Sequence, residues 1–186
     1  MEKLTEIQIN LIQTAKRGYP ILLAGAIFFF LISFAPLFFS LKALGLIWIV
    51  GLGVIFPAGI LIARMLGINL MTDNPLGKLG GLVAGTQMFY LPVFILIYQQ
   101  APAFVPFTIG LLGGSHFLPY TWIYKSKAYF FITVGTCASS LLLGLLLLDQ
   151  AYVLVPLAIS TIYSIGIMLL FKENKKSDNT DEIDFH

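Results

Sequence analysis

The fold is organised around the stretch Gly113-Gly114-Ser115-His116-Phe117-Leu118-Pro119-Tyr120-Thr121-Trp122-Ile123-Tyr124, which lies inside a long apolar segment. It contains a histidine, a proline and three aromatic residues with polar tips. Apolar runs of about 20 residues, the length of a membrane-spanning helix, recur before and after it. The pattern predicts a helical protein that crosses a membrane several times.

The composition indicates the same class. The chain has 186 residues, of which 58% are hydrophobic and 11% are charged, whereas a soluble domain is about half apolar and about a quarter charged. The net charge of +2 gives no indication of a nucleic-acid partner. The single cysteine, Cys137, cannot form a disulfide within the chain. We therefore expect an all-α integral membrane protein in contact with the lipid bilayer.

Six transmembrane helices are predicted, joined by short connections. A short amphipathic helix within residues 1–18 precedes them, because apolar residues recur at helical spacing from Leu4 to Ala15. Residues 172–186 form a polar tail of mixed charge, which we expect to be disordered and cytoplasmic. The transmembrane domain covers residues 19–171, with spans at 19–39, 43–65, 79–98, 104–124, 129–148 and 152–171.

The basic residues predict the orientation of these helices. With successive connections assigned to alternate sides, ten of the eleven Lys and Arg residues fall on the side of the two termini, and Lys42 falls on the other. Connections rich in Lys and Arg remain in the cytoplasm. We expect a multi-pass protein of the cell inner membrane with both termini cytoplasmic.

Small residues are spaced along one face of several predicted spans, where they let helix backbones approach closely. Such faces serve contacts within the bundle, with a second copy of the chain, or with a partner membrane helix. They comprise Gly77, Gly81 and Gly85; Gly110 and Gly114; Thr133, Thr136, Cys137, Ser140 and Gly144; and Ser160 and Ser164.

His116 is the titratable residue within the spans that stands out. It lies nine residues before Lys125, and Gln87 lies nine residues after Lys78, so each is roughly 14 Å from the cytoplasmic edge. Equal depth near the middle of the membrane allows the two side chains to share a pocket. The candidate ligand-binding residues are His116, Gln87, Tyr90 and Tyr120. A purely structural role for His116, bonded to a neighbouring carbonyl, is the alternative.

A second polar group is predicted at the cytoplasmic edge, in the longest connection. It consists of Arg64, Asn69, Asp73 and Asn74. An ion pair between Arg64 and Asp73 would hold the connection down, and lipid headgroup or phosphate binding is the alternative. Asn74 is expected to cap the following helix, with Pro75 as its first residue.

Signals for catalysis are weak. None of the predicted spans has Asp, Glu, Lys or Arg in its middle, and the other histidine, His186, is the last residue. Several His or Cys ligands for a metal cannot be assembled, and no nucleophile elbow or phosphate-binding loop occurs. We therefore predict no catalytic residue, metal or cofactor.

His116 to Tyr124, with the earlier Asn74-Pro75-Leu76-Gly77-Lys78-Leu79-Gly80-Gly81, resembles small bacterial multi-spanning membrane proteins in a family of unknown function. The resemblance covers predicted spans two to four, roughly half of the chain. It implies no activity, cofactor or site residue.

Three functions remain open. The first is a protein, such as a transporter, that binds or passes a small neutral or amphipathic molecule through a polar pocket at His116. The second is a structural or regulatory membrane subunit that docks a partner through its glycine-rich faces. The third is a membrane-embedded enzyme that modifies lipids at the cytoplasmic interface.

Overall fold

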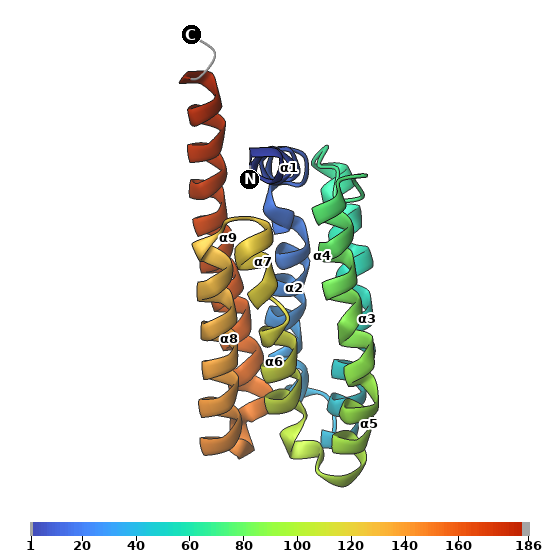
Figure 1. The fold of residues 1–186 in the computed structure, drawn as a ribbon. Coiled ribbons are helices and arrows are strands. Elements are labelled where there is room, and N and C mark those ends of the chain that lie inside the picture. Colours follow the sequence, from blue (N-terminus) through green and yellow to red (C-terminus); the bar gives the residue numbers. More distant parts are fainter. Residues whose placement is uncertain (1, 184–186) are drawn as a thin grey trace.

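The computed structural model describes residues 2–183, with side chains described from residue 3 to residue 177 (Figure 1). Every regular element in this range is helical. The α-helices are α1 (Glu2–Ala15), α2 (Tyr19–Ile32), α3 (Leu41–Met65), α4 (Pro75–Gly85), α5 (Leu91–Gln100), α6 (Val105–Ser115), α7 (Leu118–Ile123), α8 (Lys127–Leu146) and α9 (Ala151–Ile183). Short 3-10 helices join them: η1 (Lys16–Gly18), η2 (Ala35–Leu37), η3 (Thr86–Tyr90), η4 (Pro102–Phe104) and η5 (Leu148–Gln150).

Five helical segments of the described chain are long and apolar enough to cross a membrane, rather than the six predicted. They are Lys3–Leu37, Leu41–Met65, Pro75–Gln100, Lys127–Leu146 and Leu148–Ser177. The predicted span at 104–124 is instead divided into α6 and α7, neither of which is long enough alone. The sixth segment is therefore a pair of half-helices.

The break between α6 and α7 lies at His116 and Phe117. Pro119 has no N–H with which to satisfy the carbonyl of Ser115, so the regular helix cannot continue through it. The backbone tightens instead, and the Phe117 N–H donates to the Gly114 carbonyl at 3.2 Å. A similar tightening, η3, precedes Pro92 in the segment formed by α4 and α5.

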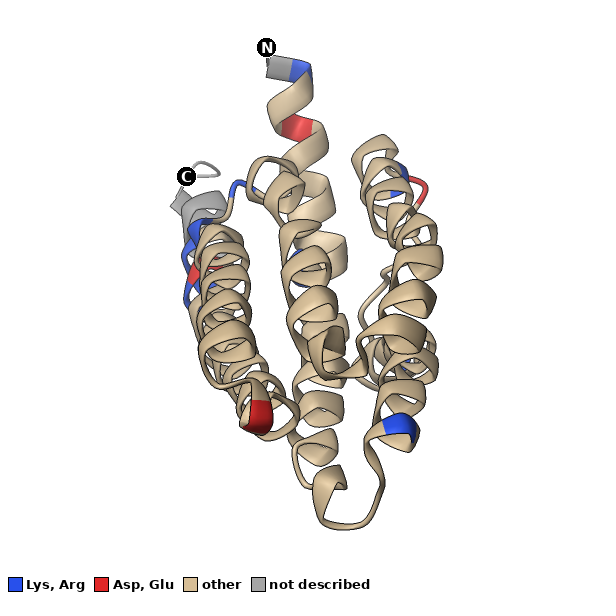
Figure 2. Cartoon of the chain, turned by 90° about the horizontal axis from the view of Figure 1, so that it is seen from below, with Lys and Arg blue, Asp and Glu red and all other residues tan. Residues whose placement is uncertain are grey.

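The charged residues lie at the ends of the long helices and in the connecting segments (Figure 2). The N-terminus, the link from α3 to α4, the turn from α7 to α8 and the C-terminal extension of α9 all lie at one end of the bundle (Figure 1). Ten of the eleven Lys and Arg residues belong to these segments, and Lys42 begins α3 at the opposite end. The arrangement matches the alternation predicted from the basic residues.

The interior is built from aromatic rings and close contacts at small residues. Phe29, Trp48, Tyr152 and Tyr163 form a buried aromatic cluster, with ring centroids 5.6–6.1 Å apart between neighbours. The Ser160 hydroxyl donates to the Ala26 carbonyl at 2.8 Å and joins α9 to α2. These contacts hold α2, α3 and α9 together.

The small-residue faces of α6 and α8 pack against one another. A Cβ atom added at Gly110 would strike Ser140, and one added at Gly114 would lie 2.9 Å from the Thr136 side chain. At Gly144 it would lie 2.7 Å from Phe107. These glycines therefore permit the close approach of the two helices.

The glycine stripe on α4 is different. No described atom outside their own helical turns lies within 4 Å of the place that a Cβ would occupy at Gly81 or Gly85. Gly77 does make close contact, with Thr72 and with Leu11 of α1. The stripe is therefore not a continuous packing face within the bundle.

The polar tail is helical where it is described. α9 continues through Ile183, although we expected residues 172–186 to be disordered. The reason lies in distant contacts: Asn174 is buried and bonds to Arg17, near the start of the chain. Residues 184–186, including His186, lie outside the described part.

Candidate functional site

A cavity of about 200 Å³ is lined by residues of α2, α3, α4, α6, α7, α8 and α9. The side chains of Gln87, His116 and Tyr120 line it, so three of the four predicted ligand-binding residues share one site. Tyr90 does not line the cavity, and its ring packs against Phe94 with centroids 6.4 Å apart. Three of the four residues thus lie at one cavity, and their role in ligand binding stays a prediction.

His116 sits at the break between α6 and α7, where it presents a ring to the cavity. Its Nδ1 atom pairs with the Gly113 carbonyl, and Nε2 has no hydrogen-bond partner among the described residues. The ring also contacts Phe117, with centroids 3.9 Å apart. The carbonyl contact predicted for a structural role thus exists, while one ring nitrogen is left for another partner.

Tyr120 and Gln87 lie on opposite walls. The Tyr120 hydroxyl donates to the Gly80 carbonyl at 2.6 Å, which joins α7 to α4 across the cavity. Gln87 belongs to η3, the irregular part of the segment formed by α4 and α5. No hydrogen bond joins Gln87 to His116 within the described structure. The break between α6 and α7 and the irregular segment η3 therefore each place a polar side chain, His116 and Gln87, at the same cavity.

Glycines border much of the cavity. Gly80, Gly81, Gly110, Gly113 and Gly114 all line it, although a Cβ added at Gly110 or Gly114 would meet side chains of α8. At Gly113, as at Gly81, no described atom lies close to the position of an added Cβ. Some residues that were predicted only as packing positions therefore also shape the site.

Thr136 is a lining residue that the sequence did not single out for binding. Its side chain is 1% exposed, and Oγ1 has no hydrogen-bond partner among the described residues. A buried hydroxyl without a partner costs free energy, on the order of 1–3 kcal/mol. Thr136 thus borders the cavity, but its hydroxyl oxygen is itself fully buried and is not open to the space.

A stack of tyrosines closes the cavity toward the basic end of the bundle. The rings of Tyr120, Tyr124 and Tyr129 lie nearly parallel, with centroids 5.4–5.9 Å apart. The Tyr129 hydroxyl donates to the Arg17 carbonyl at 2.6 Å. The Tyr124 side chain is buried within this stack.

Helix α1 crosses the same end of the bundle and is tied to two walls of the cavity. Asn74 Nδ2 donates to the Ile7 carbonyl at 2.8 Å and to Asn10 Oδ1 at 2.9 Å. Gln8 Nε2 donates to the Trp122 carbonyl at 3.0 Å. Because Asn74 precedes α4 and Trp122 belongs to α7, α1 covers the space between them.

The second predicted group does not form a site. Asn74 caps α4 as predicted, since its Oδ1 accepts from the Leu76 N–H at 2.9 Å. The predicted ion pair of Arg64 with Asp73 is wrong, because Asp73 pairs with Lys78 at 3.4 Å on the surface. Arg64 and Asn69 are exposed, and Asn74 is buried against α1, so the four side chains face different surroundings.

A buried polar cluster joins Arg17 to the C-terminal part of α9, and it was not predicted from the sequence. Arg17 is 4% exposed and donates to the Tyr124 carbonyl, to Asn174 Oδ1 and to Ser177 Oγ at 2.5–3.2 Å. Glu173 lies 3.6 Å from Arg17 Nε. Arg17 has a positive φ of 55°, and Gly18 follows with 68°, so the chain turns sharply here from α1 into α2. In the sequence, this cluster was indicated only by the pair Arg17-Gly18 directly before an apolar run.

Within the part of the chain that the structure describes, no three His, Cys, Asp or Glu side chains come together as a metal centre would require. The polar groups of the cavity are instead neutral hydrogen-bonding groups on apolar walls.

Comparison with known proteins assigns the chain to a family. No curated protein and no solved structure matches it. A family model does match, and it covers far more of the chain than the motifs around Asn74 and His116. The chain belongs to a family of unknown function, DUF7010, whose model matches residues 4–173.

Proposed function

We propose that this chain is an integral membrane protein that binds a small amphipathic molecule in the cavity at His116. The five long apolar segments support the membrane placement, since their outer surfaces carry exposed Leu, Ile, Val and Phe side chains. The concentration of basic residues at one end supports cytoplasmic termini. The half-helices α6 and α7 together complete a sixth crossing.

The observation that carries the binding proposal is the unused hydrogen-bonding capacity inside an apolar cavity. His116 lines the space, and its Nε2 atom has no partner among the described residues. Ligand pockets commonly have apolar walls with a few polar groups that orient the ligand. We therefore expect a ligand with an apolar body and one or two hydrogen-bonding groups.

The test is recovery of a bound molecule from the purified protein. The full chain, His116→Phe and the control Ser115→Ala would be purified in the same detergent, extracted with solvent and analysed by mass spectrometry. Ser115 is exposed and bonds to its own helix, so its substitution leaves the cavity intact. We expect one molecule from the wild type and from Ser115→Ala, and its loss from His116→Phe.

Two outcomes would contradict the proposal. Equal recovery from a folded His116→Phe protein would show that the ligand does not use this residue. Absence of a bound molecule from all three proteins, together with no stabilisation by added amphipathic compounds, would count against a ligand in the cavity. Circular dichroism would establish that each variant remains helical.

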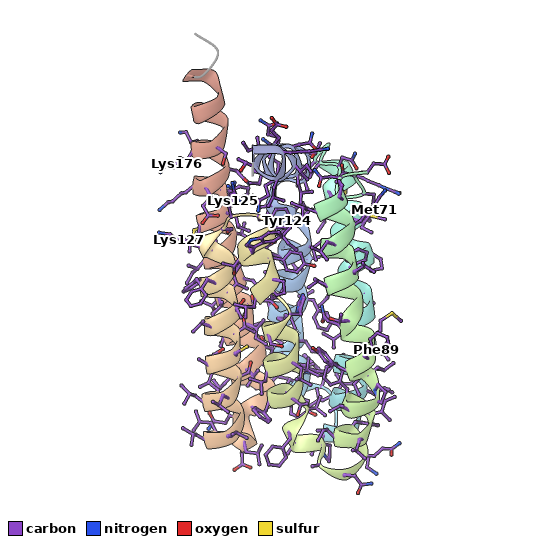
Figure 3. The ribbon with its side chains drawn as sticks, in the orientation of Figure 1. Met71, Phe89, Tyr124, Lys125, Lys127 and Lys176 are labelled. Carbon is purple, nitrogen blue, oxygen red and sulfur yellow. The ribbon has the colours of Figure 1, made fainter. Side chains whose placement is uncertain are left out.

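A second candidate function is docking of a partner membrane helix on α4 and α5. Gly85 has open space beside it, and Leu82, Met88 and Phe89 are 71%, 77% and 82% exposed. Figure 3 shows Phe89 on the outer side of this segment. Cross-linking through a cysteine at Gly85, in a chain with Cys137→Ser, would detect a second helix there.

A further inference from the structure

Lysines from two distant parts of the chain meet at the basic end of α8 and α9. Lys125 and Lys127 lie in the turn before α8 and at its start, whereas Lys172 and Lys176 lie one helical turn apart on α9. The contact that joins the two regions is a hydrogen bond of 3.1 Å from the Ala128 N–H to Glu173 Oε1. Figure 3 shows the Lys127 and Lys176 side chains extending outward on the same side. We call these four residues the lysine patch.

The carboxylate of Glu173, between Lys172 and Lys176 in the sequence, is engaged by Arg17 and by the start of α8. Glu173 is 25% exposed in its side chain, and it contacts Arg17 at 3.6 Å as well as the start of α8. Its negative charge is therefore balanced largely by the buried guanidinium. Lys125, Lys127 and Lys172 remain exposed to solvent. The acidic residues that follow along α9 begin at Asp178.

The surface directly beside the lysine patch is apolar. Phe130 and Phe131 follow Lys127 by three and four residues, so the three side chains share one side of α8. Phe130 is 55% exposed and Phe131 is 37% exposed, and Val134, one turn further along α8, is 49% exposed. A single exposed strip of α8 thus carries positive charge at its end and apolar side chains along its length.

We propose that the lysine patch binds the headgroup of an anionic phospholipid whose acyl chain lies along Phe130, Phe131 and Val134. A nucleotide or soluble phosphate would use the charge but not the apolar strip, whereas a phospholipid uses both. The inference rests on the proposed membrane placement, because that placement brings the end of α8 to the level of the headgroups. It concerns a site distinct from the cavity at His116.

Electrostatics sets the size of the effect. A lysine at the surface of an anionic membrane contributes about a fivefold gain in binding constant. Neutralising three lysines should therefore weaken the preference for an anionic lipid on the order of 100-fold. High salt should also reduce the preference of the wild-type protein for the anionic lipid, because exposed charges are screened.

Trp122 provides a readout close to the site. It is 54% exposed, and its carbonyl accepts from the Lys125 N–H at 3.3 Å, while the other tryptophan, Trp48, is fully buried. The full chain would be placed in neutral phosphatidylcholine bilayers that contain brominated phosphatidylglycerol or brominated phosphatidylcholine. Bromine quenches tryptophan fluorescence on contact, so the ratio of quenching by the two lipids measures selectivity.

We expect brominated phosphatidylglycerol to quench Trp122 more strongly in the wild type, and equal quenching in the triple variant Lys125→Gln, Lys127→Gln, Lys172→Gln. Lys78→Gln, at the same end but on α4, should keep the preference. Equal quenching in the wild type, or an unchanged preference in the folded triple variant, would overturn the lipid site. Displacement by inorganic phosphate would overturn the lipid as occupant. A chain extracted from bilayers by alkaline carbonate would refute the membrane placement itself.

Discussion

Replacement of Arg17 by methionine should destabilise the protein at the junction of α1, α2 and α9. The substitution removes hydrogen bonds to Tyr124, Asn174 and Ser177 while it keeps an apolar stem of similar length. It also leaves Glu173, whose Oε2 is buried and has no hydrogen-bond partner among the described residues, without its cation. We therefore expect the extension of α9 to detach.

The magnitude follows from the burial of the two charges. Removal of one partner from a buried ion pair costs about 3–5 kcal/mol. Arg17 is almost fully buried, but Glu173 is a quarter exposed and regains water, so we expect a loss near the lower limit, about 3 kcal/mol. Glu173→Gln in the same chain should restore part of this loss, because the orphaned carboxylate is then absent.

Unfolding in mixed micelles by increasing fractions of sodium dodecyl sulfate, followed by circular dichroism, would measure the free energy. Limited trypsin digestion would report detachment through cleavage at Lys172, Lys175 and Lys176. Lys78→Met is the control, because its ion pair with Asp73 is exposed and should contribute nothing measurable. An Arg17→Met protein with unchanged unfolding and an uncleaved α9 would refute this account of the cluster.

Two other substitutions test the packing around the cavity. Asn74→Ala removes a helix cap and the contacts to α1, so we expect a loss of about 2 kcal/mol and faster hydrogen exchange in α1, measured by mass spectrometry. Gly110→Val should cost about 1–3 kcal/mol through the clash with Ser140, whereas Gly85→Val meets open space and should leave the melting temperature in detergent unchanged or higher. Equal effects of the two glycine substitutions would contradict the described packing.

Features that depend on neighbouring residues in the sequence were predicted more accurately than features that depend on distant residues. The cap at Asn74 depends on atoms within three residues, and it was predicted correctly. Equal depth indicated that His116 and Gln87 could share a pocket, since helical rise converts sequence distance into height, and both residues line one cavity. The predicted ion pair of Arg64 with Asp73 was wrong, because two residues of one connection need not face each other.

Discontinuities and long-range contacts were harder to predict. Pro119 follows the break between α6 and α7, whereas prolines within α3 and α9 leave those helices continuous. Whether a proline breaks a helix depends on how its neighbours satisfy the freed carbonyl, and neighbours come from other helices. The same reason explains why residues 172–183 are helical: their partner, Arg17, lies about 160 residues away in the chain.

The sequence by itself determined the all-helical class, the approximate positions of the apolar segments and the gathering of positive charge at one end. These properties follow from composition, periodicity and alternation along the chain, which need no knowledge of neighbours. Only the tertiary structure decided that His116 keeps one ring nitrogen unpaired and that Thr136 joins it at the cavity. It also decided that Gly81 borders empty space while Gly110 is in contact. The physical reason is that burial and hydrogen-bond pairing belong to groups of helices in space, and identical residues acquire different roles according to what packs against them.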